Sequence, residues 1–457
     1  MRPFKDEHVN LLFSTIKKFP SGVRGMETDK TTLDDLSIFH HEEEFSIFHK
    51  LNLTRTIGGR EKLKSIFSKS LTDIKSIRDV QKTLQLILAK KEEWPLSISN
   101  GSVLMIHKFY ESNIDQIPAK PTVSTAYFYK TFHAPDYSLV KYSTGHAFDF
   151  IKGMHQIIAI FLIHDAPENL KRILQKAKIL IEKHQLDIVA AKEKISNLSM
   201  AEMLGLAHFI RYHFRQNLLE IIEIYFQLDA WYGMAMAMKE LDLVFPIFTI
   251  SKKPLLKAEG LYHILLSKPV AYDLELNQNN NFIFLTGANM AGKSTFIKAV
   301  GGAVFLAHIG MGVPARSMEL SLFNGLLSNI NVVDNVMKGE SYFYNEVQRI
   351  KKTILKINDG RQWLILIDEL FKGTNVQDAM KCSTVVIEGL IKIKNSVFIL
   401  STHLYEIGEA LKNYSNIDFK YFETNVEDEQ LSFNYNLKNG ISNDRLGYLI
   451  LKREKVI

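Results

Sequence analysis

The chain has 457 residues, a mass of 52.4 kDa and a composition that is 46% hydrophobic and 23% charged. It can therefore form two or three folded domains, and disorder throughout is excluded. Its 56 Lys and Arg against 50 Asp and Glu give a net charge of +6, spread evenly over the two halves. This excludes an arginine-rich protein that binds through bulk charge, but leaves open a nucleic-acid surface made of a few placed Lys and Arg.

The cysteine content and the apolar runs indicate the compartment. Cys382 is the only cysteine, which excludes an internal disulfide and a zinc site built on thiolates. The charged N-terminus does not resemble a signal peptide, and the longest apolar run, Ile157–Ile163, is far shorter than the roughly 20 residues of a membrane span. We therefore expect a cytoplasmic protein that does not enter a membrane.

Residues 1–30 are expected to be an N-terminal extension, and residues 31–250 a helical domain. Leu, Ile and Phe recur there at three- and four-residue spacing, and prolines are sparse outside residues 95–135. Two stretches, Glu168–Leu198 and Ala201–Glu240, are long enough to act as levers or coiled-coil arms. The second contains no proline, and as one continuous helix it would reach about 60 Å at 1.5 Å per residue.

Two features of the helical region leave alternatives open. Lysines line one side of Glu168–Leu198, and a solvated face is favoured there over a phosphate-contacting surface. Between Lys90 and Asp149, prolines are interspersed with a group of aromatic residues, which favours packing of an irregular connection over stacking on nucleic-acid bases. These aromatic residues are Tyr110, Tyr127, Phe128, Tyr129, Phe132, Tyr137 and Tyr142.

Residues 251–457 change character, with the boundary near residues 246–258. Short apolar runs at Phe282–Thr286, Trp363–Ile367 and Ser396–Ser401 alternate with glycine loops and helical patterns, which is typical of an α/β domain with a mostly parallel sheet. Near the end, Ile417–Glu423 and Gln430–Leu437 alternate like an appended antiparallel pair. The predicted fold class is thus an all-helical domain followed by an α/β domain.

A phosphate-binding loop follows the first of these runs. The pattern G-x-x-x-x-G-K-[ST] lies between an apolar strand and a helical stretch, which is the context that a P-loop requires. Its backbone N–H groups and the helix N-terminus would bind phosphate oxygens, its lysine would neutralise the β- and γ-phosphates, and its serine would ligate Mg²⁺. The predicted nucleotide-binding residues are Gly287, Ala288, Asn289, Met290, Ala291, Gly292, Lys293, Ser294 and Thr295.

Two acids at the end of a later apolar strand complete the predicted site. Asp368 is expected to hold Mg²⁺ together with Ser294, and Glu369 to polarise the attacking water. The adjacent Glu favours hydrolysis over simple nucleotide holding, and the absence of an Asn-Lys-x-Asp sequence favours ATP over GTP. His403, at the end of Ser396–Ser401, is predicted to sense the γ-phosphate or orient the water, and is grouped with Lys293 and Glu369 as catalytic.

These motifs together resemble the MutS family of ABC-type ATPases. The P-loop is similar to the family's Gly-Pro-Asn-Met-Gly-Gly-Lys-Ser-Thr, and Asp368 to Thr374 to its Asp-Glu-x-x-Arg-Gly-Thr. Glu340 to Phe343 with Glu346 looks like the family's signature segment, and Thr402-His403 matches its Thr-His. Thr54 to Leu63 is similar to the family's helical core. The resemblance implies a helical core and lever domain followed by an ABC-type P-loop ATPase domain.

The resemblance also implies partners. In MutS-like dimers the signature serine, here Ser341, reaches the γ-phosphate bound to the other subunit, so a homodimer with composite ATP sites is expected. Sequence similar to the core begins near residue 31, so the family's mismatch-reading and connector domains are not expected. The position where relatives place an aromatic for adenine stacking offers only Tyr272, and the arginine after the Asp-Glu pair is Lys372.

The leading hypothesis is an ATP-switched dimer that binds mismatched, branched or otherwise structured DNA in repair or recombination. The alternative is a MutS-like regulatory ATPase that acts on a protein or on a ribonucleoprotein such as the ribosome. A transporter ATPase is disfavoured, because the Glu340–Phe343 region does not resemble an LSGGQ signature. The resemblance leaves open the preferred nucleic-acid structure and whether the dimer needs ATP to form.

Overall fold

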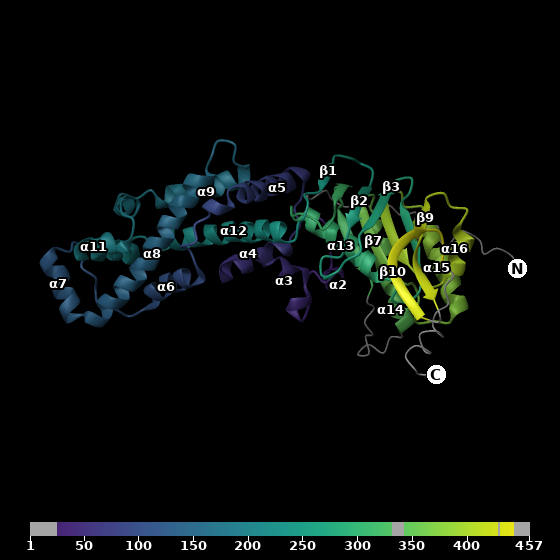
Figure 1. The fold of residues 1–457 in the computed structure, drawn as a ribbon, viewed down its shortest axis with the longest axis horizontal. Helices are drawn as coiled ribbons and strands as arrows, with labels where there is room; N and C mark the ends of the chain where they lie inside the picture. Colours follow the sequence, from purple (N-terminus) through teal and green to yellow (C-terminus); the bar gives the residue numbers. More distant parts are fainter. Residues whose placement is uncertain (1–24, 331–341, 428–429, 443–457) are drawn as a thin grey trace. The chain divides into compact units, whose positions relative to one another are not determined.

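The computed structural model describes residues 25–330, 342–427 and 430–442 (Figure 1). Within these limits the chain forms two compact units. One, the sheet unit, contains residues 25–50, 69–77 and those from 241 onward, and the other, the helical unit, contains residues 51–68 and 78–240. Among the residues that the structure describes, no helix combines the length and the apolar character needed to cross a bilayer.

The helical unit is built from α-helices and short 3₁₀ turns, as the three- and four-residue spacing of its apolar residues predicts. Two of its helices, α8 and α12, are much longer than the others. The elements are α4 (Ile57–Phe67), α5 (Ile74–Ala89, whose first turn belongs to the sheet unit), η2 (Lys91–Glu93), α6 (Asn100–Glu111), α7 (Val123–Phe132), α8 (Ala134–Phe161), α9 (Glu168–Ile181), η3 (His184–Leu186), α10 (Asp187–Ala191), η4 (Ile195–Asn197), α11 (Met200–Tyr212) and α12 (Arg215–Glu240).

The stretch Ala201–Glu240 does not form the one continuous helix that its lack of proline allows. The buried Phe214 interrupts it, because its N–H donates to the Phe209 carbonyl at 3.0 Å and the two rings stack with centroids 5.5 Å apart. This turn separates α11 from α12. A stretch without proline is therefore not enough to predict one helix, since an apolar side chain that gains burial at a turn also ends it.

The stretch Glu168–Leu198 is likewise not a single helix. Only α9 is long there, and η3, α10 and η4 follow it as short pieces. Leu186 is buried, and His184 Nδ1 lies 2.9 Å from the Asp187 carboxylate, so local contacts stabilise the turns. The chain resumes a regular helix at Ser199, whose side chain and that of Glu202 form a capping box at the start of α11.

A buried carboxylate ties α4 to α12. Asp229 on α12 is fully buried and accepts hydrogen bonds from the N–H groups of Arg55 and Thr56, at 2.9 and 2.8 Å, and from the Thr56 hydroxyl at 2.6 Å. Thr56 in turn caps α4 by accepting from the Gly59 N–H. A Cβ on Gly59 would lie 2.0 Å from the Asp229 carboxylate, so glycine is required there. These contacts explain the Thr-x-x-Gly pattern of this segment.

The sheet unit contains two sheets and the helices that cover them. One sheet has the strand order β1-β5-β2-β3 and the other the order β10-β9-β4-β8-β7-β6. The elements are α2 (Lys30–Asp35), η1 (Glu43–Phe45), α3 (Ile47–Leu51), β1 (Ile247–Thr249), β2 (Leu255–Leu261), β3 (Tyr272–Asn277), β4 (Phe282–Thr286), α13 (Lys293–His308), β5 (Ser317–Ser321), β6 (Gly325–Asn329), α14 (Tyr342–Ile357), β7 (Trp363–Asp368), α15 (Val376–Leu390), β8 (Ser396–Ser401), α16 (Tyr405–Leu411), β9 (Ile417–Glu427) and β10 (Gln430–Asn439).

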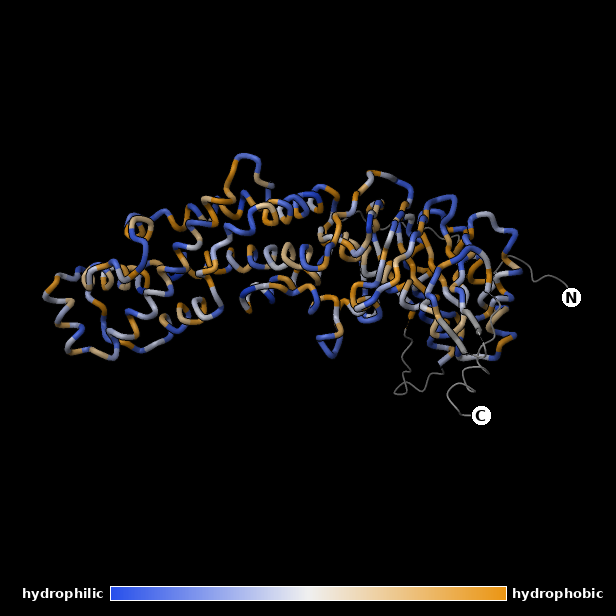
Figure 2. Tube along the Cα trace, in the orientation of Figure 1, coloured by the Kyte–Doolittle hydropathy of each residue, from blue (hydrophilic) through white to orange (hydrophobic). Residues whose placement is uncertain are grey.

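The six-stranded sheet contains the apolar runs that the sequence identifies. The strands β9, β4, β8, β7 and β6 pair in parallel in that order, and β10 pairs antiparallel with β9. Every residue of β4, β7 and β8 is buried. Hydrophobic segments run through the interior of the sheet unit in Figure 2. The four-stranded sheet is not part of the sequence prediction, because its strands are short or alternate with exposed polar residues.

Helices cover both faces of the six-stranded sheet. On one face Trp363, Ile365 and Ile367 of β7 pack in a cluster with α14, α15 and α16. On the other face α13 approaches so closely that a Cβ on Gly301 would lie 2.6 Å from Leu366. Alternate residues of β7 therefore serve different helices, and the carboxyl end of β7 lies beside the N-terminus of α13.

Residues 25–50 belong to the sheet unit, although the sequence analysis groups residues from 31 with the helical domain. Asp35 of α2 accepts a hydrogen bond from the Ser328 hydroxyl at 2.6 Å, and Thr32 accepts from the Ser328 N–H at 3.0 Å. Arg349 of α14 also reaches Asp35, at 3.3 Å. A periodic apolar pattern identifies α2 as a helix but does not show which unit covers it.

Candidate active site

The P-loop joins β4 to α13 and turns sharply. Gly287 and Gly292 have φ angles of 142° and 104°, in the region that favours glycine, and Met290 has a φ of 70°. Gly292 is the N-cap of α13, so the first N–H groups of this helix face the loop. The pattern of glycines therefore produces a concave row of backbone donors at a helix N-terminus, which suits an anionic group.

Lys293 lies inside this loop. Its residue is only 6% exposed, and its ammonium donates to the carbonyls of Gly287 and Ala288 at 2.7 and 2.9 Å. Within the described residues, no carboxylate lies within the 4.0 Å of an ion pair with it. Burial lowers the pKa of Lys293, and the charges of Asp368 and Glu369 only partly offset this effect. A buried ammonium held only by carbonyls is well placed to receive a phosphate.

Ser294 and Asp368 meet at the end of β7. The Ser294 hydroxyl donates to one Asp368 carboxylate oxygen at 2.5 Å, and the Ser401 hydroxyl of β8 donates to the other. Asp368 is 9% exposed. Parallel pairing of β7 with β8 puts Asp368 opposite Ser401, which fixes this arrangement. Two residues that are 74 positions apart thus present adjacent oxygen atoms.

Glu369 follows Asp368 in a strained backbone conformation. Its φ angle is 65°, and its N–H donates to the Ser401 carbonyl at 2.9 Å. Its carboxylate lies 3.3 Å from His403 Nδ1 and 3.4 Å from the Lys372 ammonium. A non-glycine residue in the left-handed region is uncommon and costs about 1 kcal/mol or more, so surrounding contacts hold Glu369 in place.

The electrostatic surroundings of Glu369 favour its ionised form. Burial raises the pKa of this carboxyl, but the hydrogen bond from His403 and the charges of Lys372, His403 and Lys293 outweigh burial and lower the pKa to about 2. The side chain of Glu369 is 18% exposed, whereas that of His403 is 53% exposed. A fixed carboxylate therefore faces the P-loop at neutral pH, with an accessible imidazole beside it.

A pocket of about 530 Å³ opens between the P-loop, the end of β7 and the β3 and β10 strands. Its size is within the range of small-molecule sites. The lining combines most of the predicted P-loop residues with both acids and with several residues outside the motifs. The residues are Leu266, Lys268, Val270, Tyr272, Ala288, Asn289, Met290, Gly292, Lys293, Ser294, Thr295, Asp368, Glu369, Lys372 and Tyr435.

The aromatic residues of this pocket differ from the sequence expectation. Tyr272 is only 5% exposed and its ring packs edge-on against Phe296 and Phe422, at 5.4 and 5.7 Å between centroids. Tyr435 of β10, in contrast, is 40% exposed, lies next to Gly292 and has a φ of 54°. Sequence reasoning missed Tyr435, because a register shift in the β9–β10 pair brings it to the pocket from 143 positions beyond Gly292.

The remaining predicted residues are distributed as follows. Gly287 and Ala291 belong to the P-loop but do not line the pocket, and His403 contributes through Glu369. Ser341 lies outside the described residues. The following helix α14 carries Glu346, which is 4% exposed and accepts the N–H groups of Lys372 and Gly373 at 3.0 Å each.

The loop after Glu369 is also ordered by its own residues. Asn375 caps α15, since its side chain accepts the Asp378 N–H at 3.0 Å. A Cβ on Gly373 would lie 2.7 Å from the backbone nitrogen of Phe343, so the loop packs closely against the start of α14. The loop that follows β7 thus packs against the N-terminal part of α14.

Comparison with known proteins identifies relatives of this part of the chain. Residues 283–455 match the family model MutS domain V. The DNA mismatch repair protein MutS of Thermotoga maritima is 27% identical over 60% of this chain and 34% of its own length, and that of Pseudothermotoga lettingae is 30% identical over 50% and 28%. The Streptococcus sanguinis protein of the same name is 25% identical over 58% and 31%.

The chain spans about a third of the length of these curated relatives, so the likeness concerns one part of them. That part includes the P-loop, the Asp368–Glu369 pair and His403, all of which fall within the residues matched by the family model. Residues 283–455 of the chain are thus similar to MutS domain V, and the functional motifs lie inside that similarity.

Proposed function

We propose that the chain is a Mg²⁺-dependent ATPase of the MutS type that acts on DNA as a dimer. The single observation that carries the ATPase proposal is the pocket in which the buried Lys293 ammonium faces the Asp368–Glu369 pair across the P-loop. Residues of this pocket are suited to phosphate binding, to Mg²⁺ binding and to positioning of the attacking water.

Nucleotide binding rests on Lys293 and on the backbone of the P-loop. The Lys293 ammonium is shielded from water and has no carboxylate partner among the described residues. The negative charge of a polyphosphate would compensate for the hydration that the ammonium loses on burial. The N–H groups at the start of α13 add donors and the positive end of the helix dipole. Phosphate binding would therefore favour the charged form of Lys293, and the ammonium would neutralise part of the ligand's charge.

The residues also fit a magnesium ion. Mg²⁺ prefers oxygen ligands and usually takes few of them from the protein, and Ser294 with Asp368 offers a hydroxyl and a carboxylate 2.5 Å apart. A magnesium ion held by Ser294 and Asp368 would supply positive charge against the negative charge of the phosphates. Ser401 holds the other Asp368 oxygen and so orients the carboxylate toward Ser294.

Glu369 is the residue that would act on water. A carboxylate whose pKa is about 2 is a weak proton acceptor at neutral pH, because efficient bases have pKa values near the working pH. We therefore assign Glu369 the task of holding the attacking water by accepting its hydrogen bond, as an ionised acceptor. His403 and Lys372 hold the carboxylate on either side and keep it charged.

The apolar and aromatic part of the pocket lining suits a nucleobase. Leu266 and Val270 supply apolar surface, and Tyr435 of β10 supplies an accessible aromatic ring. Tyr272 is packed among other rings and serves as part of the wall. We propose Tyr435 in place of Tyr272 as the aromatic that stacks on adenine.

The DNA part of the proposal is supported by the three relatives described above, each of which is a DNA mismatch repair protein MutS. The dimer part is supported by the motif around Ser341, which in the MutS resemblance completes the partner's site. Action on a ribonucleoprotein remains the function to consider if DNA does not bind.

Two measurements test the proposal separately. Phosphate release from ATP, with Mg²⁺ or with EDTA, tests the enzyme, and hydrolysis that is absent or independent of Mg²⁺ would contradict it. Fluorescence anisotropy with mismatched, junction and homoduplex DNA, with and without ATP at modest salt, tests the partner. Hydrolysis without binding to any DNA would leave the ATPase in place and overturn the DNA assignment.

A further inference from the structure

A second large concavity lies in the helical unit, along α8. It has a volume of about 610 Å³ and is lined by α8 residues at three- and four-residue spacing from Ala134 to Asp149, together with Lys130 of α7 and Ile195 of η4. At 1.5 Å per residue this stripe of α8 is about 22 Å long. An open groove of this length suits an extended polymer better than a compact small molecule.

The groove carries positive charge that the protein does not neutralise. Within the described residues, neither Lys130 nor Lys141 forms an ion pair, and the Lys130 ammonium lies 5.9 Å from the centroid of the Tyr137 ring. The one acidic residue in the lining is Asp149, so two lysines against one aspartate leave a surplus of one positive charge. The groove therefore favours a negatively charged occupant.

Aromatic rings accompany these charges. Tyr142 is 58% exposed, and its ring meets the His146 ring edge-on, with centroids 4.6 Å apart. On α7, Tyr127, Phe128 and Phe132 are 56–68% exposed. The prediction that the aromatic residues of this region pack internally is thus wrong for these four, although Tyr129 and Tyr137 are buried. Of these four, Tyr142 lines the groove, and an exposed ring beside lysines that form no ion pair is a combination that single-strand binders use.

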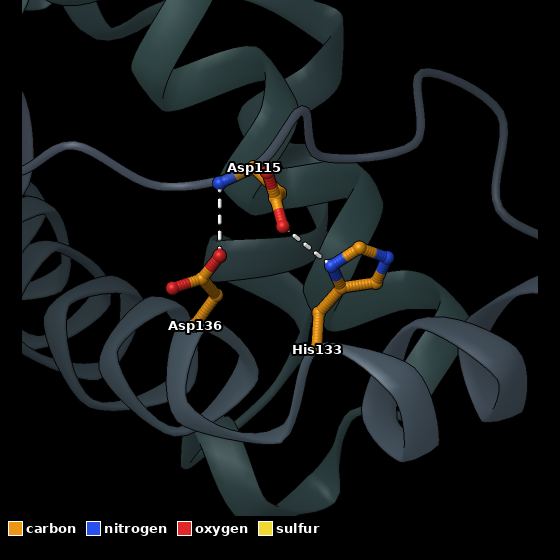
Figure 3. A group of neighbouring side chains, drawn as sticks. All are labelled: Asp115, His133 and Asp136. Carbon is orange, nitrogen blue, oxygen red and sulfur yellow. Dashed lines mark hydrogen bonds and ion pairs between the residues drawn. The ribbon is translucent and has the colours of Figure 1, made fainter.

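The junction of α7 and α8, where the groove begins, is stabilised by contacts among three residues, Asp115, His133 and Asp136 (Figure 3). His133 Nδ1 lies 2.6 Å from the Asp115 carboxylate, and the Asp115 N–H donates to the Asp136 carboxylate at 2.9 Å. These three groups lie close enough to surround a metal ion, but they already pair with one another. We interpret these contacts as structural, because they hold the end of α7, which carries Lys130, in place relative to α8.

We propose that the α8 groove binds an unpaired strand of nucleic acid, with phosphates near Lys130 and Lys141 and bases stacked on Tyr142. An acidic peptide would satisfy the lysines but would leave the exposed Tyr142 ring unused, whereas every base has a face that can stack on an aromatic ring. This inference rests on the nucleic-acid partner of the proposed function and names its form, but it does not depend on ATP hydrolysis.

The test is fluorescence anisotropy with a labelled oligothymidylate of about 16 nucleotides and a duplex of the same length. We expect the wild type to bind the single strand more tightly than the duplex. Tyr142→Ala should weaken that binding by about fivefold or more, and Tyr142→Phe should retain it. Lys141→Glu should weaken it by about tenfold, whereas Lys82→Glu, a reversal on α5 outside the groove lining, should change it by less than about twofold.

A third variant, Gly145→Leu, fills the groove and leaves its charges and rings unchanged. A Cβ at Gly145 would lie 3.7 Å from Ile195, which is ordinary contact, so a side chain can begin there without a backbone clash. We expect it to reduce single-strand binding while far-UV circular dichroism and ATP binding stay at wild-type values.

Several outcomes would overturn the groove proposal. They are equal losses for Lys141→Glu and Lys82→Glu, wild-type binding by both Tyr142→Ala and Gly145→Leu, or displacement of the strand by polyglutamate as readily as by unlabelled oligothymidylate. Binding of duplex alone would also overturn it, but would leave the proposed DNA partner intact. Binding of no nucleic acid at all would instead contradict the DNA partner itself.

Discussion

The pocket at the P-loop and the groove along α8 are both lined by cations and aromatic rings. They differ in whether their charged side chains have partners within the protein. At the P-loop, Lys293 is held by two carbonyls and Glu369 by His403 and Lys372. In the groove, Lys141 forms no ion pair within the described residues.

The difference indicates two kinds of ligand. Paired and buried groups favour one geometry, which suits a reaction on a defined small molecule. Unpaired and exposed groups accept a range of positions, which suits a flexible polyanion whose sequence is not read. The following predictions test this contrast, from the largest expected effect to the smallest.

The substitution Glu369→Gln should have the largest effect. It keeps the shape of the side chain but removes the charged acceptor for water, so we expect ATP hydrolysis to slow by about a thousandfold with ATP affinity nearly unchanged. Single-turnover phosphate release and equilibrium ATP binding separate the two quantities. Glu193→Gln, on the helical unit, is the control and should hydrolyse ATP normally. A wild-type rate for Glu369→Gln would show that the carboxylate does not act on water.

Lys293→Ala should abolish tight nucleotide binding. Loss of a buried charged donor to phosphate is expected to cost about 3 kcal/mol, or about a hundredfold in affinity. Calorimetric titration with ATP and Mg²⁺ measures this, with the exposed Lys252→Ala as the control. Single-strand binding in the groove should be unchanged, because the two sites lie in different units. Affinity for ATP within threefold of the wild type would contradict the assigned contact.

The depressed pKa of Glu369 predicts a pH dependence of stability. The carboxyl titrates near 4.5 when unfolded and at about 2 when folded, so its ionised form stabilises the fold fully above pH 4.5. That contribution is lost as the pH falls from 4.5 toward 2. The difference in unfolding free energy between the wild type and Glu369→Gln, measured by urea denaturation, should be constant from pH 7 to 5 and shift against the wild type below 4.5. A difference that is already changing near pH 6 would point to another group.

Much of the P-loop pocket could be predicted from sequence because its parts are local. A glycine pattern after an apolar strand determines the loop, and parallel pairing then brings the end of β7 to its side, so Asp368 meets Ser294 as expected. Tyr435 could not be predicted, because its position depends on an irregular register in β10. Ser341 lies outside the described residues, and its role stays a prediction.

The helical unit was harder to predict. Apolar periodicity identifies its helices, but the end of α11 depends on the burial of Phe214, and the exposure of Tyr142 depends on which elements cover α8. Both are properties of packing between distant segments, which periodicity does not contain. No sequence motif marks the groove either, because its lining also depends on how distant segments pack. Binding to nucleic acid without sequence preference needs only aromatic rings and cations close to the strand.

The smallest predicted effect comes from a matched pair of glycines on helices of the helical unit. Gly145→Ala places a Cβ in ordinary contact with Ile195, and because alanine favours a helix it should stabilise the unit by about 0.5–1 kcal/mol. Gly59→Ala places the same atom 2.0 Å from the Asp229 carboxylate and should destabilise it by about 1–3 kcal/mol. Thermal unfolding followed by far-UV circular dichroism measures both. Equal shifts would show that helix propensity alone decides, and that the Asp229 contacts do not constrain α4. Opposite shifts, with single-strand binding kept by Gly145→Ala, would show that the groove tolerates a methyl group where the junction of α4 and α12 does not.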